Sequence, residues 1–164
     1  MKRIFTLFLI DVAIAIVLLS LLAGCQKENL VDIEVIYVSH QLFENTYINK
    51  IDLVNKVYSS TLPINTSKNN GNEFVCDLDD DKIETFRRNV KEYDFLSWEG
   101  EYKWPGEYYD GHMWSITICF SDSTEKTVYG HMRYPETWNE MSDAFERLTD
   151  SYVLGKRSNT PPGG

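Results

Sequence analysis

The stretch from residue 112 to residue 121 constrains the fold most, because apolar and polar side chains alternate along it. The apolar set is Trp114, Ile116, Ile118 and Phe120, and the polar set is Ser115, Thr117, Cys119 and Ser121. Side chains of a strand point in turn to the two faces of a sheet, so the pattern predicts a strand with one buried face. The chain therefore needs a second layer packed against one face of a sheet.

Two other stretches supply that layer, because each carries an apolar stripe at helical spacing. The stripe within residues 78–98 consists of Ile83, Phe86, Val90, Tyr93 and Leu96. The stripe that follows Pro135 consists of Trp138, Met141, Phe145, Leu148 and Tyr152. Asp79 is placed to cap the first helix, Pro135 to open the second and Gly155 to end it. We expect Phe86 and Phe145, at the centres of the two stripes, to be core residues.

Four further segments are predicted to be strands, and they are residues 31–39, 46–58, 73–77 and 127–134. Residues 41–45 are predicted to be a turn and residues 59–72 a loop. Gly100, Pro105 and Gly106 argue against a regular element across residues 99–111. The pairing expected for the last two strands is Phe120 with Val128, Ile116 with Met132 and Trp114 with Tyr134.

The elements follow in the order strand-strand-strand-helix-strand-strand-helix. The sequence therefore predicts an α+β domain, in which an antiparallel sheet of about five strands carries two amphipathic helices packed on one face. The 164 residues suit one domain of this kind.

The N-terminus has the features of a secretory signal. Lys2 and Arg3 precede an apolar run over residues 4–22, which Asp11 interrupts, and Leu22-Ala23-Gly24-Cys25 follows. This order resembles the lipobox of bacterial lipoproteins. The resemblance implies that residues 1–24 are removed and that Cys25 is acylated. The alternative is an uncleaved membrane anchor, in which Asp11 would be costly.

The lipoprotein resemblance implies a place in the bacterial cell envelope, facing the periplasm or the exterior. Residues 25–30 would then be a lipid-anchored tether, residues 31–155 the α+β domain and residues 156–164 a disordered tail. The membrane would be a partner through acylated Cys25. The formal charge of −9 argues against nucleic acid and favours neutral or cationic partners.

The C-terminal part carries a second resemblance. Asp110-Gly111, the alternating strand at 114–120, Gly130, Tyr134-Pro135 and Trp138 resemble a pattern of small uncharacterised bacterial lipoproteins and secreted domains. These families have no assigned activity, so the resemblance implies none for this chain.

Metal and cofactor sites are not expected. Asp77, Asp79 and Asp81 fit the first ligand positions of a calcium loop, but Lys82 and Arg88 occupy the positions of its glycine and its bidentate glutamate. The pattern therefore favours a helix cap over a calcium site as the role of these aspartates. The three histidines, which are His40, His112 and His131, do not have the spacing of metal ligands.

Nucleophilic catalysis has one weak candidate. Cys119 and His131 share a face in the expected register, diagonally opposed, and no third group stands out to orient the histidine. Cys76 and Cys119 are also candidates for a disulfide, which an extracytoplasmic location permits. Against the disulfide, Cys76 shares a face with Phe74 and Leu78, whereas Cys119 lies opposite the apolar face. The question of a disulfide stays open.

The loop at residues 98–111 is the candidate binding surface, because it concentrates aromatic rings and carboxylates. The candidate residues are Trp104, Tyr102, Tyr108, Tyr109 and Glu107. Such side chains suit a glycan, peptide or protein ligand. The alternative is that the rings fold inward as a cluster at the end of the sheet, and we expect this of Trp98.

The sequence thus predicts a membrane-anchored extracytoplasmic lipoprotein that acts as a non-catalytic binding or interaction module and has no cofactor. Two alternatives are an accessory subunit of an envelope complex and an acidic inhibitor of a cationic hydrolase. A hydrolytic enzyme is the reading that the sequence favours least.

Overall fold

The computed structural model describes residues 32–42, 45–61, 73–105 and 111–157. The strands are β1 (Ile33–Leu42), β2 (Asn45–Asp52), β3 (Val57–Thr61), β4 (Glu73–Asp77), β5 (Glu101–Lys103), β6 (Met113–Phe120) and β7 (Glu125–His131). The helices are α2 (Asp80–Glu92), the 3-10 turn η1 (Phe95–Ser97) and α3 (Trp138–Thr149). The predicted signal sequence, Cys25 and the predicted tether lie outside the described residues. Over the described ranges, no helix is long and apolar enough to cross a membrane.

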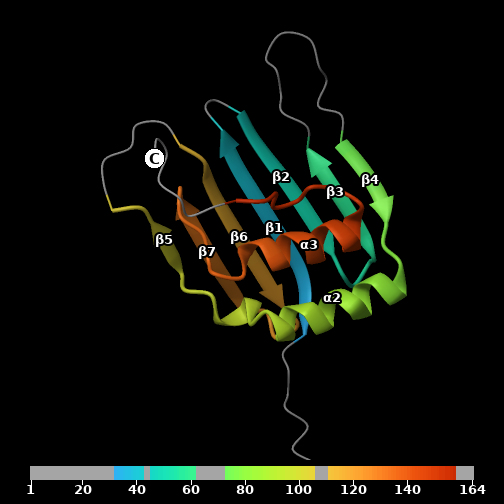
Figure 1. Cartoon of the computed structure of the whole chain (residues 1–164). Coiled ribbons are helices and arrows are strands. Elements are labelled where there is room, and N and C mark those ends of the chain that lie inside the picture. The colour runs from blue at the N-terminus through green and yellow to red at the C-terminus, as the bar shows by residue number, and fades with distance from the viewer. Residues whose placement is uncertain (1–31, 43–44, 62–72, 106–110, 158–164) are drawn as a thin grey trace, which may run out of the picture. The chain divides into compact units, whose positions relative to one another are not determined.

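The seven strands form one mixed sheet in the order β4-β3-β2-β1-β6-β7-β5, and both helices lie on the same face of it (Figure 1). The α+β class is confirmed. The expected number of about five strands and the expected order of elements are wrong. The sheet has two more strands than expected, because one predicted strand is a hairpin and one predicted loop contains a short strand.

The segment predicted as one strand, residues 46–58, is a hairpin. A turn over residues 53–56 separates β2 from β3, and Lys56 adopts a left-handed conformation with φ 57°. The Asp52 carboxylate accepts hydrogen bonds from the backbone and side-chain nitrogens of Asn55, at 2.8 and 3.1 Å. Because Leu53 and Val54 are apolar and neither Gly nor Pro is present, composition did not reveal this turn.

The other additional strand is β5, which lies in the segment predicted to be irregular. Glu101–Lys103 pairs in parallel with Tyr129–His131 of β7 and forms one edge of the sheet. Gly100 and Pro105 flank these three residues rather than interrupt them. A strand of three residues fits between Gly100 and Pro105. The expectation that these residues exclude a regular element was therefore wrong.

The turn between β6 and β7 is shorter than expected. Ile116 faces Val128 and Trp114 faces Gly130, so the expected register was wrong by four residues. The Phe120 nitrogen donates to the Thr124 carbonyl at 2.9 Å, and Ser123 takes a left-handed conformation with φ 66°. A three-residue turn of this kind closes a hairpin tightly. The shift is even, so the apolar faces of the two strands still match.

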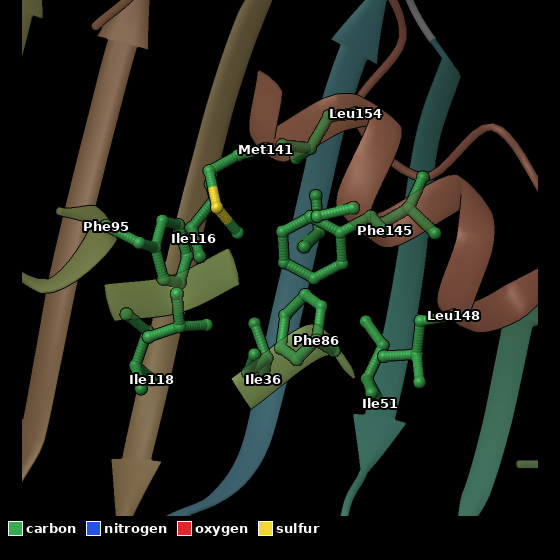
Figure 2. Close-up of a cluster of buried hydrophobic side chains, with 14 of the residues drawn as sticks. Ile36, Ile51, Phe86, Phe95, Ile116, Ile118, Met141, Phe145, Leu148 and Leu154 are labelled. Carbon is green, nitrogen blue, oxygen red and sulfur yellow. The ribbon is translucent and has the colours of Figure 1, made fainter. Parts of the chain in front are cut away.

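The core lies between the sheet and the two helices. Its fully buried members include Ile36, Ile51, Ile116 and Ile118 from the sheet, and Phe86, Met141, Phe145 and Leu148 from the helices. Figure 2 shows Phe86 of α2 and Phe145 of α3 together in this cluster, and their ring centroids are 4.9 Å apart. Both phenylalanines are core residues, as predicted.

Both predicted helices are shorter than their stripes. Asp79 caps α2 as predicted, with its Oδ1 accepting from the backbone of Asp81 at 2.8 Å. The helix ends before Asp94, whose left-handed φ of 51° precedes η1. The second helix ends where Asp150 turns left-handed. Tyr152, the last member of the predicted stripe, is therefore 81% exposed.

Truncating either central phenylalanine should destabilise the domain strongly. We expect Phe86→Ala or Phe145→Ala to lower the free energy of unfolding by about 3–5 kcal/mol, because each leaves a cavity in a closed core. Val54→Ala, at a turn position that is 59% exposed, should change it by less than about 0.5 kcal/mol. Urea unfolding measures all three. A loss below about 1 kcal/mol for both phenylalanines would contradict this packing.

Candidate functional site

A hollow of about 540 Å³ lies between the helix-facing side of β1 to β4 and the chain that follows α3. We call it the histidine pocket, and its lining residues are His40, Tyr47, Asn49, Tyr58, Ser60, Phe74, His112, Ser151, Tyr152, Val153, Leu154, Gly155 and Arg157. No acidic residue is among these described lining residues. Among the same described residues, Arg157 alone has a permanent positive charge.

One wall of the histidine pocket is the closing segment, residues 151–157, which turns back from the end of α3 over the sheet face that carries the helices (Figure 1). The side chains of Val153 and Leu154 are buried. The Trp138 Nε1 donates to the Gly155 carbonyl at 2.9 Å. The closing segment is therefore held by the core.

The end of the closing segment is fixed by one asparagine of α3. The Asn139 side chain donates to the Arg157 carbonyl and accepts from the Arg157 nitrogen, both at 2.9 Å. Lys156 also forms an ion pair with Asp143 at 2.5 Å. Lys156 and Arg157 belong to the predicted tail 156–164, and both contact α3. The rest of that tail lies outside the described residues.

The floor of the pocket is a pair of buried, stacked imidazoles. His40 follows Ile36 and Val38 in the inward-facing row of β1, and His112 precedes β6. Their ring centroids are 5.0 Å apart, and His40 Nδ1 lies 2.8 Å from His112 Nε2. His40 Nε2 lies 2.6 Å from the Val153 carbonyl, and His112 Nδ1 lies 3.1 Å from the Tyr134 hydroxyl.

The partners of this chain of hydrogen bonds fix the tautomers. A carbonyl can only accept, so the His40 Nε2 must donate to Val153 and its Nδ1 must accept. The His112 Nε2 then donates to His40, and its Nδ1 accepts the Tyr134 proton. This pattern suits two neutral rings, because each ring then has one donor nitrogen and one acceptor nitrogen.

The surroundings favour that neutral state. Burial, together with the neighbouring His40 and Arg157, lowers the pKa of His112 to about 3. Burial also lowers the pKa of His40, and Arg157 adds to the effect, while the bond to Val153 opposes it. Both imidazoles are therefore neutral at physiological pH.

Arg157 lines the pocket, and no acidic side chain of the described residues pairs with it. Its Nη1 donates to the Lys156 carbonyl at 3.0 Å, and its guanidinium also bonds the Tyr134 side chain. Its Nε is buried and has no hydrogen-bond partner. None of the ion pairs found within the described ranges includes Arg157.

The remaining walls are aromatic with neutral polar groups between them. The rings of Tyr58 and Phe74 meet edge to face at 6.1 Å, and Phe74 is 50% exposed. The Tyr58 hydroxyl donates to Asn49 Oδ1 at 2.9 Å, which leaves the amide nitrogen of Asn49 unused by that bond. The pocket thus combines an apolar rim with neutral donors and one cation.

Two candidate residues of the predicted binding loop, Tyr102 and Trp104, fall within the described residues. Tyr102 packs against the core with its ring 5.9 Å from that of Trp114, and Trp104 is half-buried, with its backbone nitrogen donating to the His131 carbonyl at the end of β7. Trp98 is buried against Phe95 and Trp138, as expected. The other candidates, Glu107, Tyr108 and Tyr109, lie outside the described residues.

The cysteines and His131 are far apart. Cys119 pairs with Glu125 at one end of the β6–β7 hairpin, while His131 pairs with Met113 at the other, so the diagonal dyad expected from the wrong register does not form. Burial, with nearby Glu125, raises the pKa of the Cys119 thiol, which weakens it as a nucleophile. Both Cys76 and Cys119 are free, and three strands separate β4 from β6.

Sequence reasoning missed the histidine pocket although a signal was present. His40 has the same strand parity as Ile36 and Val38, and His112 the same parity as Trp114. A histidine on the buried side of each of two strands indicates a polar spot in the core. Their partners, Val153 and Arg157, come from the other end of the chain.

The neutral imidazoles should make the domain less stable as the pH falls. In the unfolded chain a histidine titrates near pH 6.5, whereas folding lowers the pKa of both rings. Below pH 6.5 the unfolded state therefore binds more protons, and the free energy of unfolding decreases. We expect a fall between pH 7 and pH 5 in urea unfolding.

A His112→Asn variant serves as the comparison. It should be less stable at pH 7, yet lose less free energy of unfolding between pH 7 and pH 5 than the parent, because one titration is gone. Parallel pH profiles for the two proteins would contradict the assignment of His112 as a buried neutral ring.

The chain matches no protein-family model, and no curated protein has a significantly similar sequence. The account of function therefore starts from the chemistry of the histidine pocket and from the sequence patterns.

Proposed function

We propose that this protein is a lipid-anchored, non-catalytic binding module of the bacterial cell envelope, and that its ligand occupies the histidine pocket. The observation that carries the proposal is the pocket itself: a hollow of about 540 Å³ with an aromatic rim and a polar floor. Concave sites of this size and mixed lining are typical of small-molecule binding.

The state of the imidazoles supports binding rather than catalysis. All four ring nitrogens of His40 and His112 lie within hydrogen-bond distance of groups of this chain. A general base needs a ring nitrogen that can take a proton from the substrate. Neither histidine has one free, so they serve as a rigid floor that orients the closing segment.

The envelope location rests on the N-terminal pattern of basic start, apolar run and Leu22-Ala23-Gly24-Cys25. Several acyl chains on one cysteine anchor a protein stably, since each buried CH₂ contributes about 0.8 kcal/mol. Without residues 1–24 the chain has 14 basic and 24 acidic residues, and this negative charge would hold the domain off an anionic leaflet.

Replacing the Cys25 thiol should prevent attachment of lipid. The chain expressed in a bacterium should be found in the membrane fraction, and intact-mass spectrometry should show acyl groups on Cys25 at a new N-terminus. Cys25→Ser should abolish the acylation, whereas Cys76→Ser should not. A Cys25→Ser chain that still carries lipid and is still cut before residue 25 would contradict the proposal.

Ligand binding can be tested by filling the pocket. Ser60 lines the histidine pocket, while Ser59, its neighbour on β3, faces the other side of the sheet. We expect the purified protein to retain small molecules from an envelope extract, measured by dialysis and mass spectrometry. Ser60→Trp should abolish retention, and Ser59→Trp should preserve it. Equal retention by both variants, or none by the parent, would contradict a ligand in this pocket.

A further inference from the structure

We propose that the histidine pocket takes a ligand with a single carboxylate next to an apolar group, and that Arg157 binds the carboxylate. This inference rests on the proposed binding function and adds the chemical class of the ligand. It is carried by three observations on the pocket: its charge, its neutral floor and its aromatic rim.

The charge of the pocket is opposite to that of the protein. The chain has 25 acidic and 16 basic residues, yet the described lining of the pocket contains no Asp or Glu and one Arg. Arg157 has a buried Nε without a partner and belongs to none of the ion pairs in the described part of the chain. A partly buried guanidinium without an anion is a costly arrangement, which an anionic ligand would relieve.

One negative charge matches this site better than two. The two imidazoles that face the ligand space are neutral, so the guanidinium supplies the only formal positive charge among the described lining residues. A phosphate dianion would need a second cation, whereas a carboxylate is the planar monoanion that a guanidinium binds in a fork. The Asn49 amide and the Ser60 hydroxyl add neutral donors on the facing wall.

The rim selects the other part of the ligand. Phe74 is half exposed, Tyr152 is 81% exposed, and both line the pocket beside Tyr58. When an apolar or aromatic group covers exposed rings beside a hollow, the burial of their surface favours binding. The ligand therefore has an apolar body that lies on these rings while its carboxylate reaches Arg157.

Two sources of such a ligand share this chemistry: a free small acid and the C-terminus of a peptide with an apolar last residue. The probes for the first are 4-phenylbutyrate and its neutral amide, 4-phenylbutyramide. The probes for the second are Ala-Ala-Phe with a free carboxylate and the same peptide with a C-terminal amide. Inorganic phosphate tests the charge argument. Isothermal titration calorimetry with the full-length Cys25→Ser protein measures each Kd.

We expect at least one acid to bind about tenfold or more tightly than its amide, because a charge-assisted hydrogen bond is lost in the amide. Arg157→Gln should remove this preference, Arg157→Lys should keep part of it, and Arg88→Gln, on the exposed side of α2, should leave it unchanged. The comparison of acid with amide on the parent protein holds even if an Arg157 variant fails to fold.

The outcomes separate this inference from the proposed function. Tighter binding of phenylbutyrate assigns a small acid, and tighter binding of Ala-Ala-Phe assigns a peptide C-terminus; both support a carboxylate site. Equal Kd values for acids and amides, phosphate binding as tight as that of either acid, or no binding of any acid would overturn it. Binding of other molecules that Ser60→Trp abolishes would then still support the histidine pocket as a ligand site.

Discussion

Trp138 connects the sheet, the helices and the closing segment, and the rest of the domain depends on its packing. Its ring lies 4.6 Å from that of Trp114 on β6, 5.0 Å from that of Tyr134 and 5.9 Å from that of Trp98. Its Nε1 donates to the Gly155 carbonyl. One side chain at the start of α3 therefore fixes the helix on the sheet and also holds the chain that closes the pocket.

A glycine on β7 provides the space for this cluster, because it has no side chain. Gly130 faces Trp114 in the β6–β7 register, and a Cβ at this glycine would lie 2.5 Å from the indole. The Trp114 ring therefore lies across the glycine and reaches Trp138. From Tyr134, ring contacts continue to His112 and His40, so the aromatic core runs without interruption into the floor of the histidine pocket.

Local patterns predicted the parts of this fold that depend on neighbours in the chain. The alternation at Trp114–Phe120 and the cap at Asp79 involve residues a few positions apart, and both were predicted correctly. The β2–β3 turn was missed because Leu53 and Val54 have no turn signature, and β5 because its three residues are held only by pairing with β7. The wrong β6–β7 register followed from a turn whose left-handed residue is Ser123 rather than glycine.

The candidate site could not be predicted because its bonds join distant parts of the chain. His40 meets His112 across 72 residues and Val153 across 113. Strand parity places both histidines on the buried side, but only the tertiary fold shows that they meet and that Arg157 arrives beside them. The aromatic loop attracted attention by composition, yet its Trp98 and Tyr102 serve the core.

The central claim is that two neutral imidazoles form the floor of a ligand pocket. His112 donates to His40, and His40 donates to the closing segment. Nitrogen-15 NMR of the histidine side chains tests it most directly, since one- and two-bond couplings report the tautomer and charge of each ring. The account predicts that His40 and His112 are both neutral Nε2–H tautomers at pH 7 and that His112 remains so at pH 5. An imidazolium signal for His112 at pH 5, or an Nδ1–H tautomer for either ring, would contradict it.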